Sequence, residues 1–550
     1  MWKRDNNVTK EVTIGIKTSI TRKRDGLCDD KTWAKQNNAV PLPAKLQILN
    51  MKKTTLTAIA LFAVLGTWAQ KVTTFTTTEA KPWVQGKTVL ATKAEGKVVA
   101  DVNAQSKGTT FVGFGTTFNE LDWDAFNMLT RKEQDEIMYN IFDPSGDLKF
   151  TLGRVSMNAN DYSRAWYSCD EVDGDFALKY FNIEHDKRNI IPLARAAQKY
   201  QPNLQLFMSP WSPPTWMKIN HDYPVSPNKF NNMDPRQGYL LYMDDGKNLD
   251  ADEMKLLGDR NGVFPRRLAT QDYFIQDPRY LQCYADMFCR FIELYKDEGL
   301  NITKVMYQNE AYSYTPYPGC AWTAEGTLRF NNEYLAPTLA KKHPEVELWI
   351  GTFNTNRLDY VEKILDDKTL QSNVKGIGTQ WECRNNLPAM RQRYPNHRFM
   401  VSESECGNGS MDWNAGEHTF FLLSDNIGNG CDEYYNWNFI LKDNGISPWG
   451  WTQNAMIQVD GKTRKMRYTA EYYAYKHFSH FVTEGTEMIA YGGREQSKTP
   501  VVVFRKASGQ YIVTVGNFTD DNVTLSVKIG KKYLNVTPVA HSFNTYSVVL

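Results

Sequence analysis

Short apolar runs of strand length recur along most of this chain and alternate with longer segments that have helical spacing. The runs begin at Phe111, Lys149, Leu204, Ile302, Val346, Val374, Arg398 and Cys431. The segments between them include QDEIMYNIF and YLQCYADMFCRFIELYKDEG, in which apolar residues return every three or four positions. Strands that alternate with helices in this way predict an α/β fold, a (β/α)8 TIM barrel of parallel strands, over residues 108–484.

The last part of the chain has a different pattern. Residues 485–550 alternate β-branched and polar side chains between turn residues, and residues 71–107 have the same character. A chain of 550 residues is long enough for two structural domains. We therefore expect a second, antiparallel β-domain formed by residues 485–550, to which residues 71–107 contribute strands.

A hydrophobic leader is expected at residues 51–70. The stretch MKKTTLTAIALFAVLGTWAQ has two lysines after Met51, then an apolar run, then small residues near Ala69. This pattern predicts a signal peptide and a secreted or periplasmic protein after cleavage near Ala69. The alternative is an internal hydrophobic segment that is not cleaved. Residues 1–50 are polar and aperiodic, so we expect them to be a non-native N-terminal extension.

Composition excludes some classes of partner. The formal net charge of +2 gives no overall field toward nucleic acid or anionic membranes, and the apolar leader is too short for a stable membrane span. Aromatic residues make up 13% of the chain, which suits a sugar-binding cleft but also a large core. The eight cysteines show no CxxC spacing, so no zinc ribbon is expected. Cys406 and Cys431 could be buried thiols or bridged.

Polar residues follow the predicted strands where barrel enzymes carry their chemistry, at the carboxyl ends. They are Arg154 and Asp161, Trp211, Asn309 and Glu310, Gln380 to Glu382, Glu403 and Glu405, and Asn436 to Asn438. Carboxylates on two non-adjacent strands, among tryptophans and amides, can perform glycoside hydrolysis, with one acid and one nucleophile or base. Glu403 and Glu405 would share one face of a strand, so the pattern leaves the choice between them open.

The segment YQNEAYSYTPYPGCAW resembles the acid/base segment of glycoside hydrolase family 30, which includes glucosylceramidases and β-1,6-glucanases. Further stretches are similar to the same family: GFGTTFNE, GRVSMNANDYS, MSPWSPPTWMK, GIGTQWE, SESECG and YYNWNFILKDNGISPWGWTQN. The resemblance covers residues 108–550. It implies a barrel joined to a β-sandwich, a carbohydrate substrate and a retaining double displacement that needs no metal or organic cofactor.

The resemblance also implies roles for individual residues. Glu310 would be the general acid/base and Glu403 the nucleophile, with Glu405 as the alternative. The residues implied to bind the sugar are Arg154, Asp161, Trp211, Asn309, Trp381, Asn436 and Trp437. In a retaining enzyme the two carboxyl groups should lie about 5 to 5.5 Å apart.

Departures from the family pattern bear on the substrate. Gln380 and Glu382 replace the His and Tyr of the lysosomal enzyme, and Glu120 stands where many relatives have Asp. The changed sixth strand favours a secreted β-1,6-glucanase. The alternatives are another β-glycosidase, such as a glucosylceramidase or a β-xylosidase, or a carbohydrate-binding protein without catalysis. The long segment 220–273 is expected to form a wall of the cleft, or else a surface loop.

Overall fold

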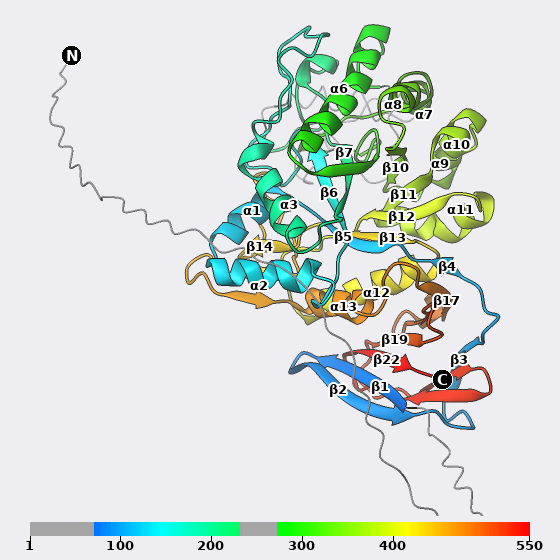
Figure 1. Cartoon of the computed structure of the whole chain (residues 1–550). Coiled ribbons are helices and arrows are strands. Elements are labelled where there is room, and N and C mark those ends of the chain that lie inside the picture. The colour runs from blue at the N-terminus through cyan, green and yellow to red at the C-terminus, as the bar shows by residue number, and fades with distance from the viewer. Residues whose placement is uncertain (1–70, 232, 234–271, 314) are drawn as a thin grey trace, which may run out of the picture. The chain divides into compact units, whose positions relative to one another are not determined.

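Nine strand segments form one parallel sheet that closes on itself (Figure 1). The computed structural model describes residues 71–231, 233, 272–313 and 315–550, so residues 1–50 and the expected leader at 51–70 lie outside the described residues. The segments are β5 (Gly113–Thr117), β6 (Leu152–Met157), β7 (Gln205–Pro210), β8 (Asn301–Val305), β9 (Glu347–Leu348), β10 (Ile350–Phe353), β11 (Gly376–Gln380), β12 (Arg398–Glu403) and β13 (Glu433–Asn436).

The order of pairing shows the barrel. The sheet runs β10-β11-β12-β13-β5-β6-β7-β8-β9, and every neighbouring pair is parallel. Its two end segments, β9 and β10, are separated in the chain only by Trp349 and together make one strand position. Each predicted apolar run contains one strand position, so the predicted (β/α)8 TIM barrel is confirmed.

Side chains fill the barrel interior, so it is a core and not a pore. A buried cluster inside it comprises Leu152, Phe207, Met306, Trp349, Met400 and Tyr435. Each comes from a strand or its immediate end, because alternate residues of a barrel strand point inward. Chemistry is therefore restricted to the mouth of the barrel, where the strands end.

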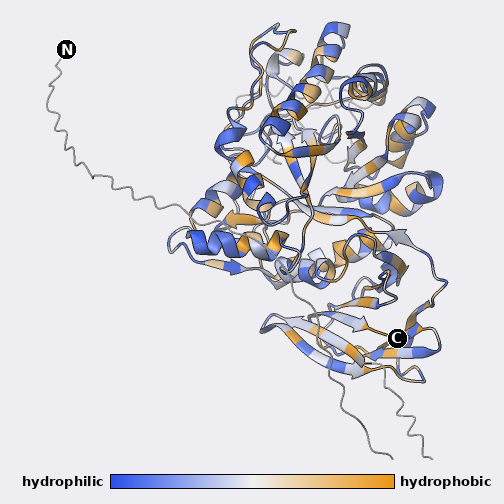
Figure 2. Cartoon of the chain, in the orientation of Figure 1, coloured by the Kyte–Doolittle hydropathy of each residue, from blue (hydrophilic) through white to orange (hydrophobic). Residues whose placement is uncertain are grey.

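Helices surround these strands, and their apolar faces turn inward (Figures 1 and 2). They are α1 (Glu120–Asn127), α2 (Arg131–Phe142), α3 (Ile190–Gln198), α6 (Pro278–Asp297), α7 (Ala324–Arg329), α8 (Ala336–Lys342), α9 (Leu358–Leu365), α10 (Lys368–Asn373), α11 (Leu387–Arg393), α12 (Trp413–Gly428) and α13 (Ala470–Ser479). Local sequence fixes where they start: Thr130 and Glu133 form a capping box on α2, and Asp277 caps α6.

Two further sheets form the β-sandwich. One has the order β2-β1-β22-β19-β18-β17-β4, and the other β21-β20-β3. Their bounds are β1 (Lys71–Thr78), β2 (Lys81–Val89), β3 (Lys97–Val102), β4 (Thr109–Thr110), β17 (Glu487–Tyr491), β18 (Val501–Arg505), β19 (Tyr511–Asn517), β20 (Leu525–Ile529), β21 (Lys532–Val536) and β22 (Ser542–Val548). Valines from both sheets share one core. β3 pairs with β20 in parallel, so the smaller sheet is mixed rather than antiparallel.

Strands from before and after the barrel combine in this sandwich, since β1 pairs with β22 over seven residue pairs. The exact limits of the two domains stay predictions. An additional small sheet, absent from the sequence prediction, follows β13 and consists of β14 (Ile440–Lys442), β15 (Ile457–Val459) and β16 (Met466–Tyr468).

The seven cysteines of the described ranges are buried free thiols. Cys406 and Cys431, which the sequence left as either buried thiols or bridged, are therefore unbridged.

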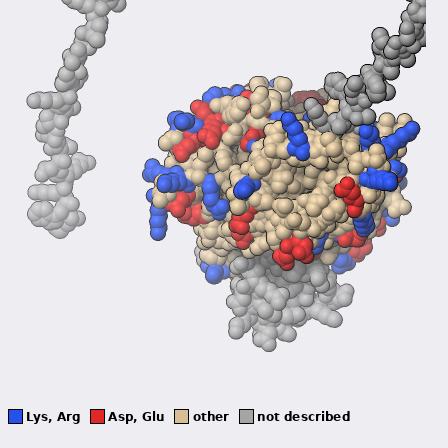
Figure 3. Space-filling model, turned by 90° about the horizontal axis from the view of Figure 1, so that it is seen from below, with Lys and Arg blue, Asp and Glu red and all other residues tan. Residues whose placement is uncertain are grey.

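The described helices and one face of the surface bear on the charge and hydropathy of the chain. Within the described ranges, no helix is both long and apolar enough to cross a bilayer. Figure 3 shows basic and acidic side chains interspersed on one face, without a large area of a single sign. This distribution agrees with the small net charge.

A buried carboxylate joins α12 to the turn after β11 and to the segment after β17. Asp425 accepts hydrogen bonds from Arg384 Nη1 at 2.8 Å, Arg494 Nε at 2.8 Å and the Tyr491 hydroxyl at 3.0 Å. Its side chain is fully buried, while that of Arg494 is 34% exposed. Two guanidinium groups therefore share one buried carboxylate.

We expect Asp425→Ala to lower the free energy of unfolding by about 3 kcal/mol, because both guanidinium groups lose their buried carboxylate partner. Urea denaturation would measure the loss. Asp366→Ala is the matched control: Asp366 pairs with Arg393 Nε at 3.0 Å, but its side chain is 46% exposed. The control should lose less than about 1 kcal/mol. Equal losses in the two variants would contradict the role given to Asp425.

Candidate active site

Two glutamates occupy the barrel mouth at the ends of two non-adjacent strands. Glu403 is the last residue of β12, and Glu310 lies five residues beyond β8. Both side chains are almost fully buried. Glu310 and Trp381 have positive φ angles of 49° and 48°, a conformation that is unfavourable for residues with a Cβ atom and that concentrates at functional sites.

Glu310 is held from several elements. Gln380 Nε2 donates to Glu310 Oε1 at 2.9 Å, and the Tyr317 hydroxyl lies 3.5 Å from Oε2. The backbone N–H of Glu310 donates to Thr352 Oγ1 at 3.0 Å. Ser402 Oγ donates to Gln380 Oε1 at 3.0 Å, so the Gln380 amide is oriented with its NH2 group toward Glu310.

Arg154 connects the two strand ends. It lies on β6, and its Nη1 donates to Glu403 Oε2 at 2.7 Å, while its Nη2 donates to Asn309 Oδ1 at 2.9 Å. Ser402 O accepts a further bond from Nη1, and Ser209 Oγ lies within reach of Nε and Nη2. All five N–H groups of the guanidinium thus face protein acceptors.

This arrangement bears on the prediction that Arg154 binds sugar hydroxyls. With its donors occupied by protein, it is placed to act through Glu403 and Asn309. The Asn309 carbonyl oxygen accepts from Arg154 and from Thr352 Oγ1 at 3.0 Å, which leaves the amide NH2 group to donate elsewhere. An amide fixed in this way beside Glu310 can bind a sugar hydroxyl.

Burial raises the pKa of both glutamates, that of Glu403 to about 7. The neighbouring Glu310 carboxyl also raises the pKa of Glu403, whereas Arg154 lowers it. Two buried carboxyl groups that repel each other titrate as a pair. The ion pair with Arg154 favours the charged form of Glu403 over its protonated form.

Arg154→Gln should move the acidic limb of the kcat/KM profile to higher pH by about one unit or more. The guanidinium lowers the pKa of Glu403, so its loss raises that pKa, and ionised Glu403 then appears only at higher pH. Arg384→Gln is the control, because its Nε lies 3.8 Å from Glu405 instead. The profile of the control should keep its acidic limb; an unmoved limb in Arg154→Gln would be evidence against the ion pair.

Glu405 points away from this group. Its Oε2 lies 2.8 Å from His418 Nε2 on α12, and its Oε1 lies 3.8 Å from Arg384 Nε. The strand ends at Glu403, so the alternation that would have put Glu405 on the same face does not continue. The structure brings Glu403 and not Glu405 to Arg154.

The other predicted sugar-binding residues differ in whether they lie beside Arg154 and the two glutamates or are bonded to other protein groups. Trp211 and Trp437 lie 5.2 Å apart, and the Arg154 guanidinium lies 4.4 Å above the Trp211 ring. Asp161 is buried with Oδ1 unbonded, and burial together with both glutamates raises its pKa. Asn436, in contrast, is engaged by the Thr116 hydroxyl at 3.2 Å and by the Tyr475 hydroxyl at 3.3 Å.

Four aromatic rings connect the two glutamates, and sequence reasoning missed three of them. Trp381 Nε1 lies 3.4 Å from Glu403 Oε1, and Trp381 packs against Trp451 at 5.8 Å between ring centroids. Trp451 contacts Trp449 at 5.2 Å, and Trp449 contacts Tyr317 at 4.7 Å. We call these four residues the aromatic arc. The three missed residues, Tyr317, Trp449 and Trp451, lie on loops, and a search limited to the carboxyl ends of strands does not find them. The tryptophan-rich motif SPWGWTQN could have indicated Trp449 and Trp451.

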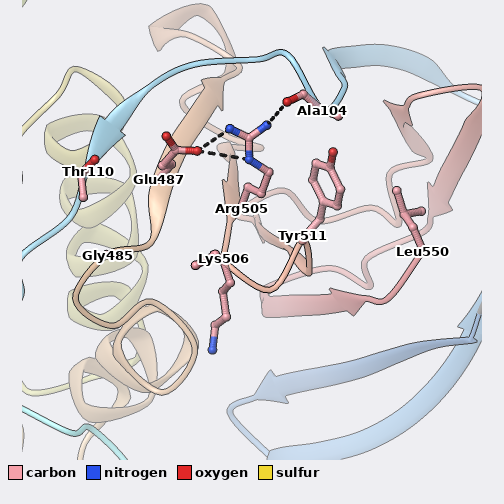
Figure 4. Close-up of a pocket in the computed structure, with 10 residues that line it drawn as sticks. Ala104, Thr110, Gly485, Glu487, Arg505, Lys506, Tyr511 and Leu550 are labelled. Carbon is pink, nitrogen blue, oxygen red and sulfur yellow. Dashed lines mark hydrogen bonds and ion pairs between the residues drawn. The ribbon is translucent and has the colours of Figure 1, made fainter.

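A separate hollow of about 560 Å³ lies in the β-sandwich (Figure 4). It is lined by Arg505, which pairs with Glu487 at 3.1 Å and donates to the carbonyl of Ala104 at 2.7 Å. The lining has one carboxylate side chain, that of Glu487, which is already paired, so it lacks the two acidic side chains of a glycosidase site. Of the long segment 220–273, residues 232 and 234–271 lie outside the described residues, so the expected wall stays a prediction.

Comparison with known proteins agrees with this geometry. The chain matches the glycosyl hydrolase family 30 TIM-barrel domain over residues 111–229 and 273–482. It is 25% identical to the lysosomal acid glucosylceramidase of Mus musculus, over 79% of this chain and 80% of that protein. It is also 25% identical to the endo-1,6-β-D-glucanase neg1 of Aspergillus fumigatus, over 54% of each.

Solved structures show the same fold. The endo-β1,6-glucanase BT3312 superimposes with a TM-score of 0.69 at 18% identity, covering 87% of this chain and 99% of that one. The family match spans more than half of the chain and includes both glutamates. The chain therefore belongs to glycoside hydrolase family 30 and is a retaining O-glycosyl hydrolase.

Proposed function

We propose that Glu403 is the nucleophile and Glu310 the general acid/base of a double displacement. The Glu403 carboxylate attacks the anomeric carbon while Glu310 gives its proton to the departing glycosidic oxygen, so one C–O bond forms as another breaks. The Glu310 carboxylate then takes a proton from water, whose oxygen displaces Glu403 from the sugar. Each residue ends in its starting state. The ion pair that places charge on Glu403 supports this assignment.

The proposed substrate is a β-1,6-glucan. The aromatic arc carries this proposal, because it extends from the nucleophile to the acid/base and consists of rings of the kind that stack on the apolar face of a pyranose. Gln380 on the sixth strand, in place of the lysosomal His, points the same way. The glucanases among the similar proteins agree with it.

A substrate screen tests the proposal. Purified protein would be incubated with pustulan, xylan and glucosylceramide, and released sugar would be quantified, with Glu310→Gln as the inactive control. We expect release from pustulan. Release from glucosylceramide or xylan alone would replace the substrate but keep the chemistry, while no release from any substrate or from an aryl β-glycoside would favour a carbohydrate-binding protein.

We also propose that the protein is exported by its leader at residues 51–70. Intact mass and N-terminal sequencing of protein recovered outside the cytoplasm would test this. Cleavage near Ala69 is expected. Retention of residues 51–70 in the recovered protein would contradict the proposal.

A further inference from the structure

We propose that Lys218 is a positioning residue for proton transfer, because its ammonium group fixes the loop that places Tyr317 against Glu310. Lys218 follows the short helical turn η2 (Thr215–Met217), beyond the end of β7. The inference rests on the proposed acid/base role of Glu310.

Lys218 occupies a site built of oxygen atoms. Its Nζ donates to the backbone carbonyls of Asp222 at 2.6 Å, Tyr223 at 2.7 Å and Gly319 at 2.7 Å, and Ser212 Oγ lies at 3.2 Å. An ammonium group has three N–H donors, which match the three carbonyls. These acceptors come from the loop after β7 and the loop after β8, so a single cation joins the two loops.

The ammonium is shielded from solvent and lies outside ion-pair distance of the described carboxylates. The residue is fully buried, and among the described residues no carboxylate forms an ion pair with it. Burial lowers its pKa to about 8, so it is still mainly protonated at neutral pH. A buried cation that is held mainly by backbone carbonyls is costly, and a lysine that merely filled space could be replaced by an apolar side chain.

The loop that Lys218 anchors carries Tyr317. Around it, Gly319 N donates to the Tyr223 carbonyl at 3.0 Å, and the Thr315 carbonyl accepts from Val225 N at 3.0 Å. The Thr315 hydroxyl donates to the Tyr317 carbonyl at 3.2 Å. The loop is therefore held by polar contacts rather than by a strand or helix of its own.

Tyr317 is the point where this loop reaches the reacting groups. Its hydroxyl lies 3.5 Å from Glu310 Oε2, and its ring packs against Trp449. A long hydrogen bond of this kind in the free enzyme can shorten when substrate binds. A displaced Tyr317 would remove the contact at Glu310 Oε2 and leave the carboxyl held from the Gln380 side. A proton donor misplaced by about 1 Å can lose a hundredfold in rate.

The experiment compares kcat/KM on substrates whose leaving groups differ in how strongly they require protonation. Aryl glycosides of the sugar identified in the substrate screen would be compared, with phenol and 2,4-dinitrophenol as leaving groups. Lys218→Met should lower kcat/KM about tenfold or more on the phenyl glycoside, which needs protonation. It should lower the value less than about threefold on the dinitrophenyl glycoside, whose leaving group departs as an anion.

Three further variants make the result specific. Tyr317→Phe should reproduce the selective loss, and Lys218→Met combined with Tyr317→Phe should lose no more than Lys218→Met alone, because the two act in series. Lys149→Met is the control: its Nζ donates to the His480 carbonyl at 3.0 Å, at a distance from the barrel mouth. The control should show no selectivity for leaving group.

Equal losses on both glycosides in Lys218→Met, or multiplied losses in the double variant, would overturn the inference. If Lys218→Met does not fold, Lys218→Gln takes its place, with the same selective loss expected and the same equal loss overturning it. Glu310→Gln separates the two proposals. If Glu310→Gln shows no leaving-group selectivity, the acid/base assignment itself is refuted. If Glu310→Gln is selective and the Lys218 variants are not, only the role of Lys218 is refuted.

Discussion

Glu403→Ala should lower kcat on every glycoside by roughly 10⁴-fold or more, the scale on which loss of a reacting side chain acts. No covalent glycosyl-enzyme can form without the carboxylate that ends β12. The change leaves an open space beside the anomeric carbon, with Arg154 still present to attract an anion. Stopped assays with an activated aryl glycoside would measure the residual rate.

Rescue of activity by sodium azide would identify which glutamate is the nucleophile. In Glu403→Ala the azide anion can enter the space, form a C–N bond to the anomeric carbon and displace the aryl oxide, which gives a glycosyl azide of inverted configuration. Glu405→Ala is the matched control, since Glu405 contacts His418 and Arg384 instead. The control should keep most of its activity and gain nothing from azide. Rescue in Glu405→Ala, with an active Glu403→Ala, would reverse the assignment.

The barrel was predictable because its signal is repeated. Eight apolar runs each specify a strand, and a wrong boundary in one leaves the others intact. The position of Glu310, Glu403 and Arg154 at strand ends then predicted that they belong to one site, because parallel barrel strands end at the same mouth. The family resemblance favoured Glu403 over Glu405, and the structure adds the end of β12, which places Glu403 beside Arg154.

The contacts made by loop residues could not be predicted from the sequence. Tyr317, Trp449 and Lys218 lie outside the barrel strands, so no periodicity indicates what they face. The functions of Lys218 and Arg154 depend on which acceptors surround them: for Lys218 these are backbone carbonyls. Backbone acceptors carry no mark in the sequence, which is why a buried lysine of this kind cannot be told from a surface lysine by pattern alone.

Glu310→Gln should separate substrates by the basicity of their leaving groups. On a phenyl glycoside or a glucan, kcat/KM should fall by about 10²- to 10⁴-fold, because the departing oxygen is no longer protonated. On a 2,4-dinitrophenyl glycoside the first step should be nearly unaffected, and glycosyl-enzyme should accumulate as a burst of dinitrophenol because water is no longer deprotonated in the second step.

The same variant predicts a change in the pH profile on the phenyl glycoside. In the proposed mechanism Glu310 is protonated, and therefore uncharged, when Glu403 ionises, so a neutral amide in its place should leave the acidic limb of kcat/KM near its wild-type position. The basic limb, which reports loss of the proton from Glu310, should disappear. Asp161→Asn offers a comparison, because Asp161 is also buried beside both glutamates but has no part in proton transfer. It should weaken binding of the sugar without creating leaving-group selectivity; selectivity there and none in Glu310→Gln would move the acid role to Asp161.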